Sequence, residues 1–598
     1  MNPYTAPLEE MRFVLRELVD IQGIAQLKDA EAVADPELMD AILEQAARFA
    51  KEVLAPLDAV GDREGARWSD QGVTTAPGFA GAYRQFIDAG WNNVSIPAEY
   101  GGQGLPILLC TALQEMFVSA NKSFCFCPEL TSFAVKALVN AASESLKALY
   151  IPQLVSGHWA GTMNLTEPQA GSDVGALRTR AVPHTDGSYR LFGQKIFISY
   201  GDHDLTENIV HLVLARTPGA PEGSKGVSLF LVPKFLLDNA QIGARNDVQC
   251  AGIEHKLGNH GSPTCTLVYG GEGEGAVGWL VGQENKGLQA MFVMVNSARF
   301  NVGLEGVALS ERAYQQALAY ARERIQGRPA EGGAESVPII RHPDVRRMLL
   351  MMRTQAEAMR AVAYVIAAER DFAVSHPDPS IRRERQAFVD LMIPIFKGWA
   401  SETGVEVAST SIQVHGGLGY IEESGASQPF RDLRVATIYE GTTSIQAHDL
   451  VERKLVRDGG AAMRAWLSQI HLTLQQLRHV QGSALGDIES GLRHAVEGLQ
   501  EASEWVLANY SQRPLEVLGG SVPLLRLCGI VVGGWQMARA GLVAHRHLEA
   551  GSGDPAFLRR KLLSARFYAD HVLSQASGLS VVAMRGGASV MALDEAAF

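Results

Sequence analysis

The sequence predicts a mainly helical protein with an inserted antiparallel β domain. Apolar residues recur at helical spacing early and late in the chain, for example in 36–56 and 341–371. From about residue 160 the pattern changes to short β-prone segments that Gly, Pro and Asn separate. Helices on both sides of a β region indicate two helical domains around a β domain, followed by a helical C-terminal extension.

The predicted N-terminal helical domain covers residues 1–160. In 36–56, one helical face carries the apolar residues Leu38, Ile42, Ala46, Phe49 and Val53. Pro56 is expected to end this helix, because proline lacks the N–H that a continuing helix needs.

The predicted β domain covers residues 161–275. Four of its segments are short, rich in β-branched and aromatic residues, and bounded by turn formers. Strands are therefore expected at 189–199, 208–215, 226–232 and 263–269.

A helical bundle is predicted over 276–455. The segment 341–371 puts methionines, leucine and alanines on one face, and such a stripe is typical of core packing rather than of a ligand site. A second long helix is expected over 386–414, ending where Gly416 and Gly417 follow His415.

The C-terminal extension, 456–598, is predicted to be helical, and the glycine-bearing segment 457–463 joins it to the bundle. Its apolar faces must be buried; one of them carries Trp466, Ile470, Leu474 and Leu477. The longest candidate for a membrane span, around Cys528–Trp535, looks too short and too rich in glycine to cross a bilayer. The sequence therefore predicts no integral membrane association.

Composition narrows the classes of function. The formal net charge of −12 argues against nucleic acid as the main partner, since phosphate binding needs a basic surface. Six cysteines in 598 residues fit a reducing cytoplasm. Cys125 and Cys127 are close in sequence, but no His/Cys cluster follows them, so no metal site is predicted. The first residues lack the basic and apolar regions of a signal peptide.

Four short segments hold candidate functional residues. The first two, MNLTEPQAGSD (163–173) and QKIFISYG (194–201), read as a polar loop and a strand of the β domain. The loop offers hydroxyls and glycine N–H groups to a polar ring or a phosphate, and the strand sets Phe197 and Ser199 on one face. Taken alone, a surface turn and ordinary strand packing explain them equally well.

The other two segments, QVHGGLGY (413–420) and RDLRVATIYEGTTSIQ (431–446), lie in the predicted bundle. Glycines after a helix allow close approach of a ligand, although a helix cap explains them too. Glu440 lies among apolar and small residues. Partial desolvation there would raise its pKa toward a value useful for a general base, whereas a solvated loop glutamate is the plainer interpretation.

Together, and in this order, TEPQAGSD, QKIFIS, QVHGGLGY and IYEGTTSIQ closely resemble the acyl-CoA dehydrogenase family across roughly 160–455. The segments APLEEMRFVLREL and HKLGNHGSPTC (255–265) resemble a subgroup of larger bacterial members with a C-terminal helical domain. That subgroup includes 3-methylmercaptopropionyl-CoA dehydrogenases and long-chain enzymes.

The resemblance implies FAD as cofactor and implies roles for individual residues. Flavin contacts are expected from Met163, Leu165, Thr166, Phe197 and Ser199, and Gly171 and Ser172 are expected at the pyrophosphate or the CoA arm. Phe197 stands where many relatives have tryptophan, and Ser199 where threonine is common. The adenine-dinucleotide half is expected on Arg324, Gln413 and Gly417 of a neighbouring subunit.

Further residues are assigned by the same resemblance. Thr442 and Ser444 are expected beside FAD, with Ser444 replacing a glutamine of some relatives. Ser172, Asn296, Arg299 and Gly441 are expected to bind the substrate. Some members carry their base at the position of Ala298, and alanine cannot accept a proton, so Glu440 is the expected catalytic base.

The implied reaction is the dehydrogenation of an acyl-CoA thioester to trans-2-enoyl-CoA. Glu440 removes the α-proton, and the β-hydride goes to the flavin. The resemblance implies electron-transfer flavoprotein as the partner that takes the electrons, a cytoplasmic location and a homodimer. An acyl-CoA oxidase that uses oxygen is the alternative, and a DNA-associated flavoprotein of the same fold is a more distant one.

Overall fold

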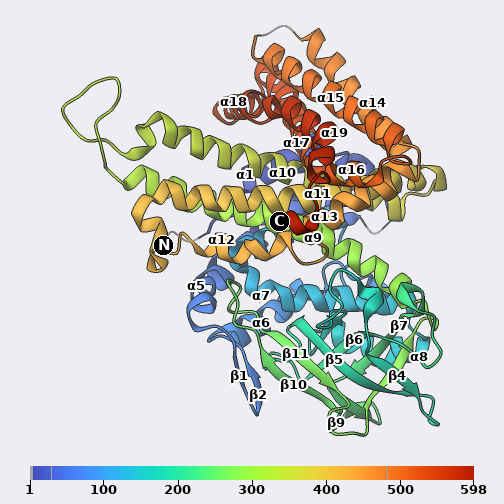
Figure 1. Cartoon of the computed structure of the whole chain (residues 1–598). Helices are drawn as coiled ribbons and strands as arrows, with labels where there is room; N and C mark the ends of the chain where they lie inside the picture. The colour runs from blue at the N-terminus through green and yellow to red at the C-terminus, as the bar shows by residue number, and fades with distance from the viewer. Residues whose placement is uncertain (1–3, 29, 481–482) are drawn as a thin grey trace. The chain divides into compact units, whose positions relative to one another are not determined.

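The computed structural model describes residues 4–28, 30–480 and 483–598 (Figure 1). The chain forms two compact units. The sheet unit comprises Arg48–Pro106 and Ala120–Ala298, and the helical unit comprises Met1–Ala47, Ile107–Ser119 and Arg299–Phe598. The predicted order of helices, β region, helices and helical extension is confirmed.

The sheet unit contains one eight-stranded sheet with the strand order β10-β11-β5-β12-β7-β6-β3, in which β4 also pairs with β5. A hairpin, β1-β2, and a second small pair, β8-β9, lie outside it. The strands are β1 (Arg67–Ser69), β2 (Gly72–Thr74), β3 (Trp159–Asn164), β4 (Arg180–Pro183), β5 (Tyr189–Ser199), β6 (Asn208–Ala215), β7 (Ser228–Pro233), β8 (Phe235–Asp238), β9 (Gln241–Arg245), β10 (Val248–Ile253), β11 (Thr264–Tyr269) and β12 (Ala276–Val281).

The predicted strands 189–199 and 208–215 match β5 and β6, and the other two begin one or two residues late, at β7 and β11. The sheet is antiparallel except for one pair, because β3 runs parallel to β6. The expectation of a wholly antiparallel sheet was therefore wrong at this pair. Two parallel strands must be joined by a long crossover connection. The Gly, Pro and Asn residues that predict short turns give no sign of such a connection.

The centre of the sheet is buried on both faces. All residues of β6 and β7 are buried. Along β6, Leu212 and Leu214 pack into one apolar cluster with α7 and α8, whereas Val213 and Ala215 pack into another with β5 and β11. This alternation is the two-residue period of a strand, and it explains why the segment reads as continuously apolar.

Helices with residues in the sheet unit are α5 (Ala55–Glu64), α6 (Phe79–Asp88), α8 (Glu144–Val155), part of α7 (Ile107–Ala141) and part of α9 (Gly287–Glu323), with short helical turns at Ala50–Leu54, Trp91–Asn93, Ala98–Tyr100, Val174–Ala176 and Gly223–Gly226. Pro56 does not end the helix of 36–56. A π-turn, Ala50–Leu54, links α4 to α5, and Pro56 falls in the first turn of α5, where its missing N–H leaves no bond unmade.

The helical unit contains α1 (Leu8–Phe13), α2 (Ile21–Ala25), α3 (Glu31–Ala34), α4 (Pro36–Phe49), α10 (Pro343–Ser375), α11 (Pro379–His415), α12 (Gln428–Leu433), α13 (Thr443–His448), α14 (Ala461–His479), α15 (Ser483–Asn509), α16 (Pro514–Gly519), α17 (Ser521–Ala550), α18 (Pro555–His571) and α19 (Ala576–Val590). Short helical turns occupy Val14–Leu18, Ile339–Arg341, Gly416–Tyr420, Glu422–Ser424, Arg434–Thr437, Asp449–Val456, Leu573–Gln575 and Glu595–Ala597.

The apolar stripes predicted in this unit are buried. In α10, Met348, Met352 and Met359 lie in the core, as expected for packing rather than for ligand binding. Helix α11 begins earlier than predicted but ends at His415, where Gly416 takes a positive φ of 59°.

The C-terminal extension packs against α10 and α11 through α17 and α18. Glycines make this close approach possible, because a Cβ on Gly529 or Gly533 would collide with Trp399 of α11. The apolar segment around Cys528–Trp535 is longer than expected: it belongs to α17, which in the described chain is the one helix long and apolar enough to cross a membrane, and 89% of its apolar window is buried inside the protein.

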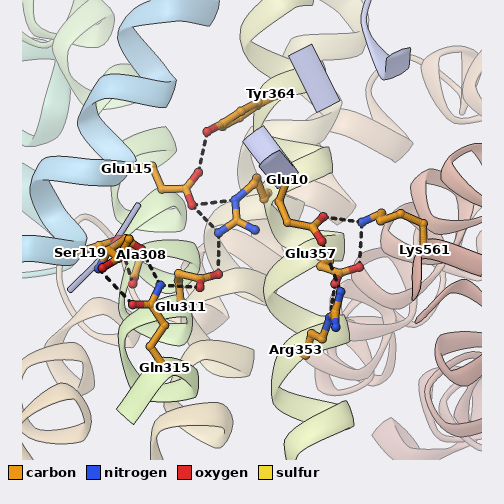
Figure 2. A network of polar contacts seen from close by, with 12 residues as sticks. Glu10, Glu115, Ser119, Ala308, Glu311, Gln315, Arg353, Glu357, Tyr364 and Lys561 are labelled. Atoms are coloured by element: carbon orange, nitrogen blue, oxygen red, sulfur yellow. Dashed lines mark hydrogen bonds and ion pairs between the residues drawn. The ribbon is translucent and has the colours of Figure 1, made fainter. Parts of the chain in front are cut away.

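A buried ionic network ties the helices of this unit together (Figure 2). Arg360 of α10 lies between Glu115 and Glu311, with its guanidinium 2.7 and 2.8 Å from their carboxylates. A second part joins Lys561 of α18 to Glu10 and Glu357, each at 2.8 Å. Lys561 is 3% exposed, so the extension is fixed to the N-terminal segment and α10 by a charge that water hardly reaches.

Candidate active site

In the sheet unit, the candidate residues follow β3 and the end of β5. Leu165 and Thr166 are partly exposed, whereas Glu167 directly after them is buried. Lys195 of β5 organises this loop: its Nζ donates to the Leu165 carbonyl at 3.0 Å and to Glu167 Oε1 at 2.8 Å. Its side chain is fully buried.

The Lys195–Glu167 pair is ionised. Burial would raise the pKa of Glu167, but the Lys195 ammonium and the N–H groups of Arg178 and Thr179 outweigh it and lower that pKa to about 2. Burial lowers the pKa of Lys195 to about 8, and Glu167 opposes that shift. The pair therefore fixes the course of the chain that carries Leu165 and Thr166.

Phe197 lies on a β-bulge with left-handed backbone. Between two register pairs, β5 takes three steps from Lys195 to Ile198 while β11 takes two from Leu267 to Cys265. Phe197 has a φ of 60°, and the residue is 59% exposed. A positive φ is costly for an aromatic residue, and a bulge of this kind re-aims a side chain. The bulge lies between Lys195 and Ile198, and buried Ile198 stands between the more exposed Phe197 and Ser199.

The remaining candidate cofactor-binding residues of the sheet unit offer open space and hydrogen-bonding groups at the surface. Gly171 and Ser172 are exposed, and nothing lies within 4 Å of a Cβ built on Gly171. Among the residues that the structure describes, the hydroxyls of Thr166 and Ser199 have no hydrogen-bonding partner. Met163 and Asn296 are half-buried. These residues fit a planar, polar heterocycle that would stack on Phe197.

In the helical unit, Glu440 lies in a tight turn before α13. Glu440 has a φ of 54° and Gly441 a φ of 88°. A Cβ on Gly441 would lie 2.8 Å from Nε2 of Gln446, so this position requires glycine. Gln446 donates to the carbonyls of Glu440 and Gly441 at 3.1 and 3.2 Å. No residue in the described chain accepts the backbone N–H of Glu440.

The Glu440 carboxyl is half-buried in a charged recess. Burial raises its pKa; Arg299 and Lys397 oppose this by attraction, and Glu305 adds to it by repulsion. Arg299 pairs with Asp449 at 3.0 Å, and Tyr439 donates to Glu305 at 2.5 Å. The site thus combines a carboxyl whose pKa is raised with an N–H donor beside it.

Thr442, Ser444 and Arg299 have contacts within the protein. The Thr442 hydroxyl caps α13 by accepting from Ile445 N, and the exposed Ser444 hydroxyl lies 3.5 Å from Nε2 of His448. Arg299 was predicted to touch CoA; the structure sets it beside the base, paired with Asp449.

Arg324, Gln413 and Gly417 are exposed at one end of the bundle. Arg324 follows α9, and Gln413 and Gly417 lie where α11 ends. The rings of Tyr320 and His415 stack with centroids 4.6 Å apart, which holds these two helix ends together. A cation beside exposed backbone suits a phosphate-bearing ligand.

Four residues of the site were not assigned a role from the sequence: Lys195, Glu305, Lys397 and Gln446. A signal existed for Lys397, since it is the one charged residue between Leu391 and Ser401 in an otherwise apolar run. Glu305 and Gln446 look like ordinary helix residues, and only the fold brings them to Glu440.

Models of known families match almost the whole chain. Successive matches are to "Acyl-CoA dehydrogenase, N-terminal domain" over 36–158, the middle domain over 162–270, the C-terminal domain over 285–455, and "Acetyl-CoA dehydrogenase C-terminal like" over 466–594.

Curated relatives are similar over their full length. The 3-methylmercaptopropionyl-CoA dehydrogenase of Ruegeria pomeroyi is 46% identical over 96% of this chain and 97% of that protein. The broad-specificity linear acyl-CoA dehydrogenase FadE5 of Mycobacterium tuberculosis is 35% identical over 100% of both.

Solved structures share the fold. An acyl-CoA dehydrogenase of Bacillus anthracis complexed with FAD has a TM-score of 0.73 at 20% identity, covering 98% of this chain and 92% of that one. A chain in a structure described as the electron transferring flavoprotein of Acidaminococcus fermentans has a TM-score of 0.57 at 25% identity, covering 70% and 97%.

Proposed function

Since the chain belongs to the acyl-CoA dehydrogenase family, we propose that it oxidises an acyl-CoA thioester to trans-2-enoyl-CoA with FAD as cofactor and Glu440 as the base. The observation that supports this best is the Glu440 turn: a half-buried carboxyl with a raised pKa, on strained backbone, beside its own free N–H. Strain of this kind is characteristic of functional sites.

Glu440 removes the α-proton of the thioester. A carboxylate is a weak base for so weak an acid, and burial helps by raising its pKa toward the working pH. Arg299 and Lys397 limit that rise by attraction, because a positive charge nearby favours the ionised carboxylate.

The backbone N–H of Glu440 is the donor for the thioester oxygen. Proton removal puts negative charge on that oxygen, and a donor already fixed in direction stabilises it without reorganising. Gln446 holds the carbonyls of Glu440 and Gly441, so the turn keeps the N–H in one orientation.

FAD, when bound, accepts the hydride from Cβ. The residues of the sheet unit fit its ring system: exposed Phe197 for stacking, and Thr166 and Ser199 with free hydroxyls. This set of the sheet unit is completed by Leu165, Met163, Gly171 and Ser172. Further proposed FAD contacts in the helical unit are Thr442 and Ser444. Arg324, Gln413 and Gly417 hold the dinucleotide half of a neighbouring subunit's FAD. Asn296, Ser172 and Gly441 contact the CoA thioester.

Electron-transfer flavoprotein is the proposed acceptor, and the fold likeness to a chain of the structure described as the electron transferring flavoprotein of Acidaminococcus fermentans supports it. The proposed location is the cytoplasm. Slow reoxidation of the substrate-reduced protein in air is expected of a dehydrogenase, and fast reoxidation would make it an acyl-CoA oxidase.

Changing Glu440→Gln tests the base. The variant keeps its shape and its bound flavin but loses α-proton abstraction, because an amide cannot accept the proton. The rate of anaerobic flavin reduction by butanoyl-CoA or 3-methylmercaptopropionyl-CoA is expected to fall at least ~10²–10⁴-fold. Glu501→Gln, the same change at an exposed position of α15, is the matched control. Near-normal reduction in Glu440→Gln would refute the assignment.

A ladder of acyl-CoA substrates resolves the acyl chain. The names of the relatives cover a short thioether acid and linear chains. Relative kcat/KM over thioether, butanoyl and long straight chains measures which one the pocket stabilises in the transition state.

A further inference from the structure

We propose that Lys397 is a positioning residue for Glu440: its ammonium holds the turn that carries the base and faces the carboxylate with a positive charge. The proposal rests on the proposed role of Glu440 as the base. Nothing in the sequence patterns assigned Lys397 a role.

Lys397 is a fully buried charge on α11. Its exposed fraction is 0%, and its Nζ donates to the Gly441 carbonyl at 2.6 Å. In the described chain it has no carboxylate within salt-bridge distance. A buried ammonium without a close counter-ion is costly, so a merely structural role would be served better by a neutral donor.

The surrounding packing brings Lys397 to the turn. Helices α9 and α11 cross closely at glycines, because a Cβ on Gly306 would collide with the Ala400 carbonyl, and one on Gly303 with Phe396. Lys397 follows Phe396 on α11, next to this crossing. Its Nζ contacts the Gly441 carbonyl in the turn that carries Glu440.

Lys397 and Gln446 share the task of holding the turn. Both donate to the Gly441 carbonyl, and Gln446 also donates to the Glu440 carbonyl. Two successive residues with positive φ are thereby locked. Lys397 differs from Gln446 in one respect, namely its charge.

Charged groups face Glu440 from several elements. Arg299 and Glu305 of α9 and Lys397 of α11 act on Glu440 itself, whereas Glu402 of α11 acts on Lys397 and Asp449 pairs with Arg299. The charge of Arg299 is partly offset by Asp449 at 3.0 Å, and Thr443 donates to Glu402 at 2.5 Å. Lys397 is therefore the cation that acts on Glu440 with the least local compensation.

The two groups titrate against each other. Burial lowers the pKa of Lys397 to about 8, with Glu440 and Glu305 opposing the shift. Below that pH, Lys397 is charged and lowers the pKa of Glu440. Removal of the charge raises the pKa of Glu440. The acid limb, which is the low-pH side of the pH profile where proton abstraction is lost as Glu440 becomes protonated, must therefore move to higher pH.

The test separates proton abstraction from hydride transfer. A CoA thioester with sulfur at position 3, 3-thiabutanoyl-CoA, can lose its α-proton but has no β-hydrogen to give up. Its enolate is followed by long-wavelength absorbance against the oxidised flavin. The signal is titrated from pH 5 to 10 in the FAD-loaded wild type and in Lys397→Met, Lys397→Arg, Gln446→Leu and Glu440→Gln.

Lys397→Met is expected to move the acid limb up by roughly one pH unit or more, the effect of losing an opposite charge nearby. Lys397→Arg keeps the limb in place, because arginine stays charged. Gln446→Leu weakens the signal without moving the limb, since no charge changes. If Lys397→Met does not fold, Lys397→Gln, which removes the charge but keeps a polar side chain, takes its place and is expected to move the limb in the same direction.

An acid limb in Lys397→Met within 0.3 unit of the wild type, or an equal shift in Lys397→Arg, overturns the proposal. So does a shift of the same size in Gln446→Leu. Failure of the proposed function looks different: Glu440→Gln would then retain the enolate signal and its acid limb.

Discussion

Phe197 and Glu440 both stand on left-handed backbone, with φ values of 60° and 54°. Such a conformation is uncommon for non-glycine residues and costs roughly 1–3 kcal/mol. In each case the surroundings impose it: the β5–β11 register sets the bulge at Phe197, and Lys397 with Gln446 holds the turn at Glu440. The chain spends stability at the two positions proposed to meet the flavin and the substrate.

Arg324→Ala is expected to weaken FAD binding. Arg324 is exposed at the end of α9, and a cation near the pyrophosphate offsets its charge. Titration of FAD into apoprotein, followed by the change in flavin fluorescence, measures the loss, expected to be about 10-fold for one charge-assisted hydrogen bond.

Arg322→Ala is the matched control for that experiment, because Arg322 is equally exposed two residues earlier. Equal affinities in both variants and the wild type would remove Arg324 from the proposed site.

Glu440 could be proposed as the base from the sequence because its neighbours carry a family signature. Lys397 and Lys195 could not be singled out, since a lysine in an apolar run does not reveal the carbonyl that it contacts. The conformation of Phe197 was also beyond reach. The strand pattern of 189–199 predicts alternation, and the bulge depends on pairing with β11, 65 or more residues away along the chain.

At the scale of elements, the sequence pattern predicted correctly those strands whose ends are set by neighbouring turn residues. Strands β5 and β6 were predicted to the residue, because turn formers bound them. The parallel partner of β6 is β3, whose register is fixed only after the intervening chain has crossed the sheet. The prediction that Pro56 ends the helix was wrong, because a π-helical turn at Ala50–Leu54 connects α4 to α5 and Pro56 falls in the first turn of α5.

Lys561→Met is expected to destabilise the extension. Lys561 lies between Glu10 and Glu357 at 2.8 Å, and its loss leaves two buried carboxylates sharing Arg353 (Figure 2). Breaking a buried ion pair by removing one partner costs ~3–5 kcal/mol. Limited proteolysis and the thermal unfolding midpoint measure the loss.

Arg560→Ala is the control on the same helix. Arg560 pairs with Glu9 at 3.2 Å, and both side chains are about half exposed, so the expected cost is below ~1 kcal/mol. If both variants unfold at the same midpoint, the buried network does not hold the extension.

At the scale of the whole molecule, the extension covers a face of its own bundle. Helix α17 packs on α10 and α11, with Trp399 seated against its glycines. The apolar face of Trp466, Ile470, Leu474 and Leu477 is buried, as predicted. A surface covered in this way is not available to a second pair of subunits, which supports the proposed homodimer.

Light scattering at several concentrations is expected to give the mass of two subunits. C2 dimers are the commonest closed assembly, and the exposed Arg324 and Gln413 need a neighbour to serve the proposed FAD site. A stable mass of four subunits in the intact chain, unchanged after deletion of 456–598, would refute the covering role of the extension.

The ionic network of Figure 2 also sets an order of events during synthesis. Glu10 and Lys561 are 551 residues apart in the chain. At about 5–20 residues per second, a ribosome needs roughly half a minute to two minutes to cover that distance. Throughout this interval Glu10 lacks the Lys561 ammonium, and of its two cationic partners only Arg353 is made during it. The N-terminal segment is made first, and its contact with Lys561 can form only after α18 has been made.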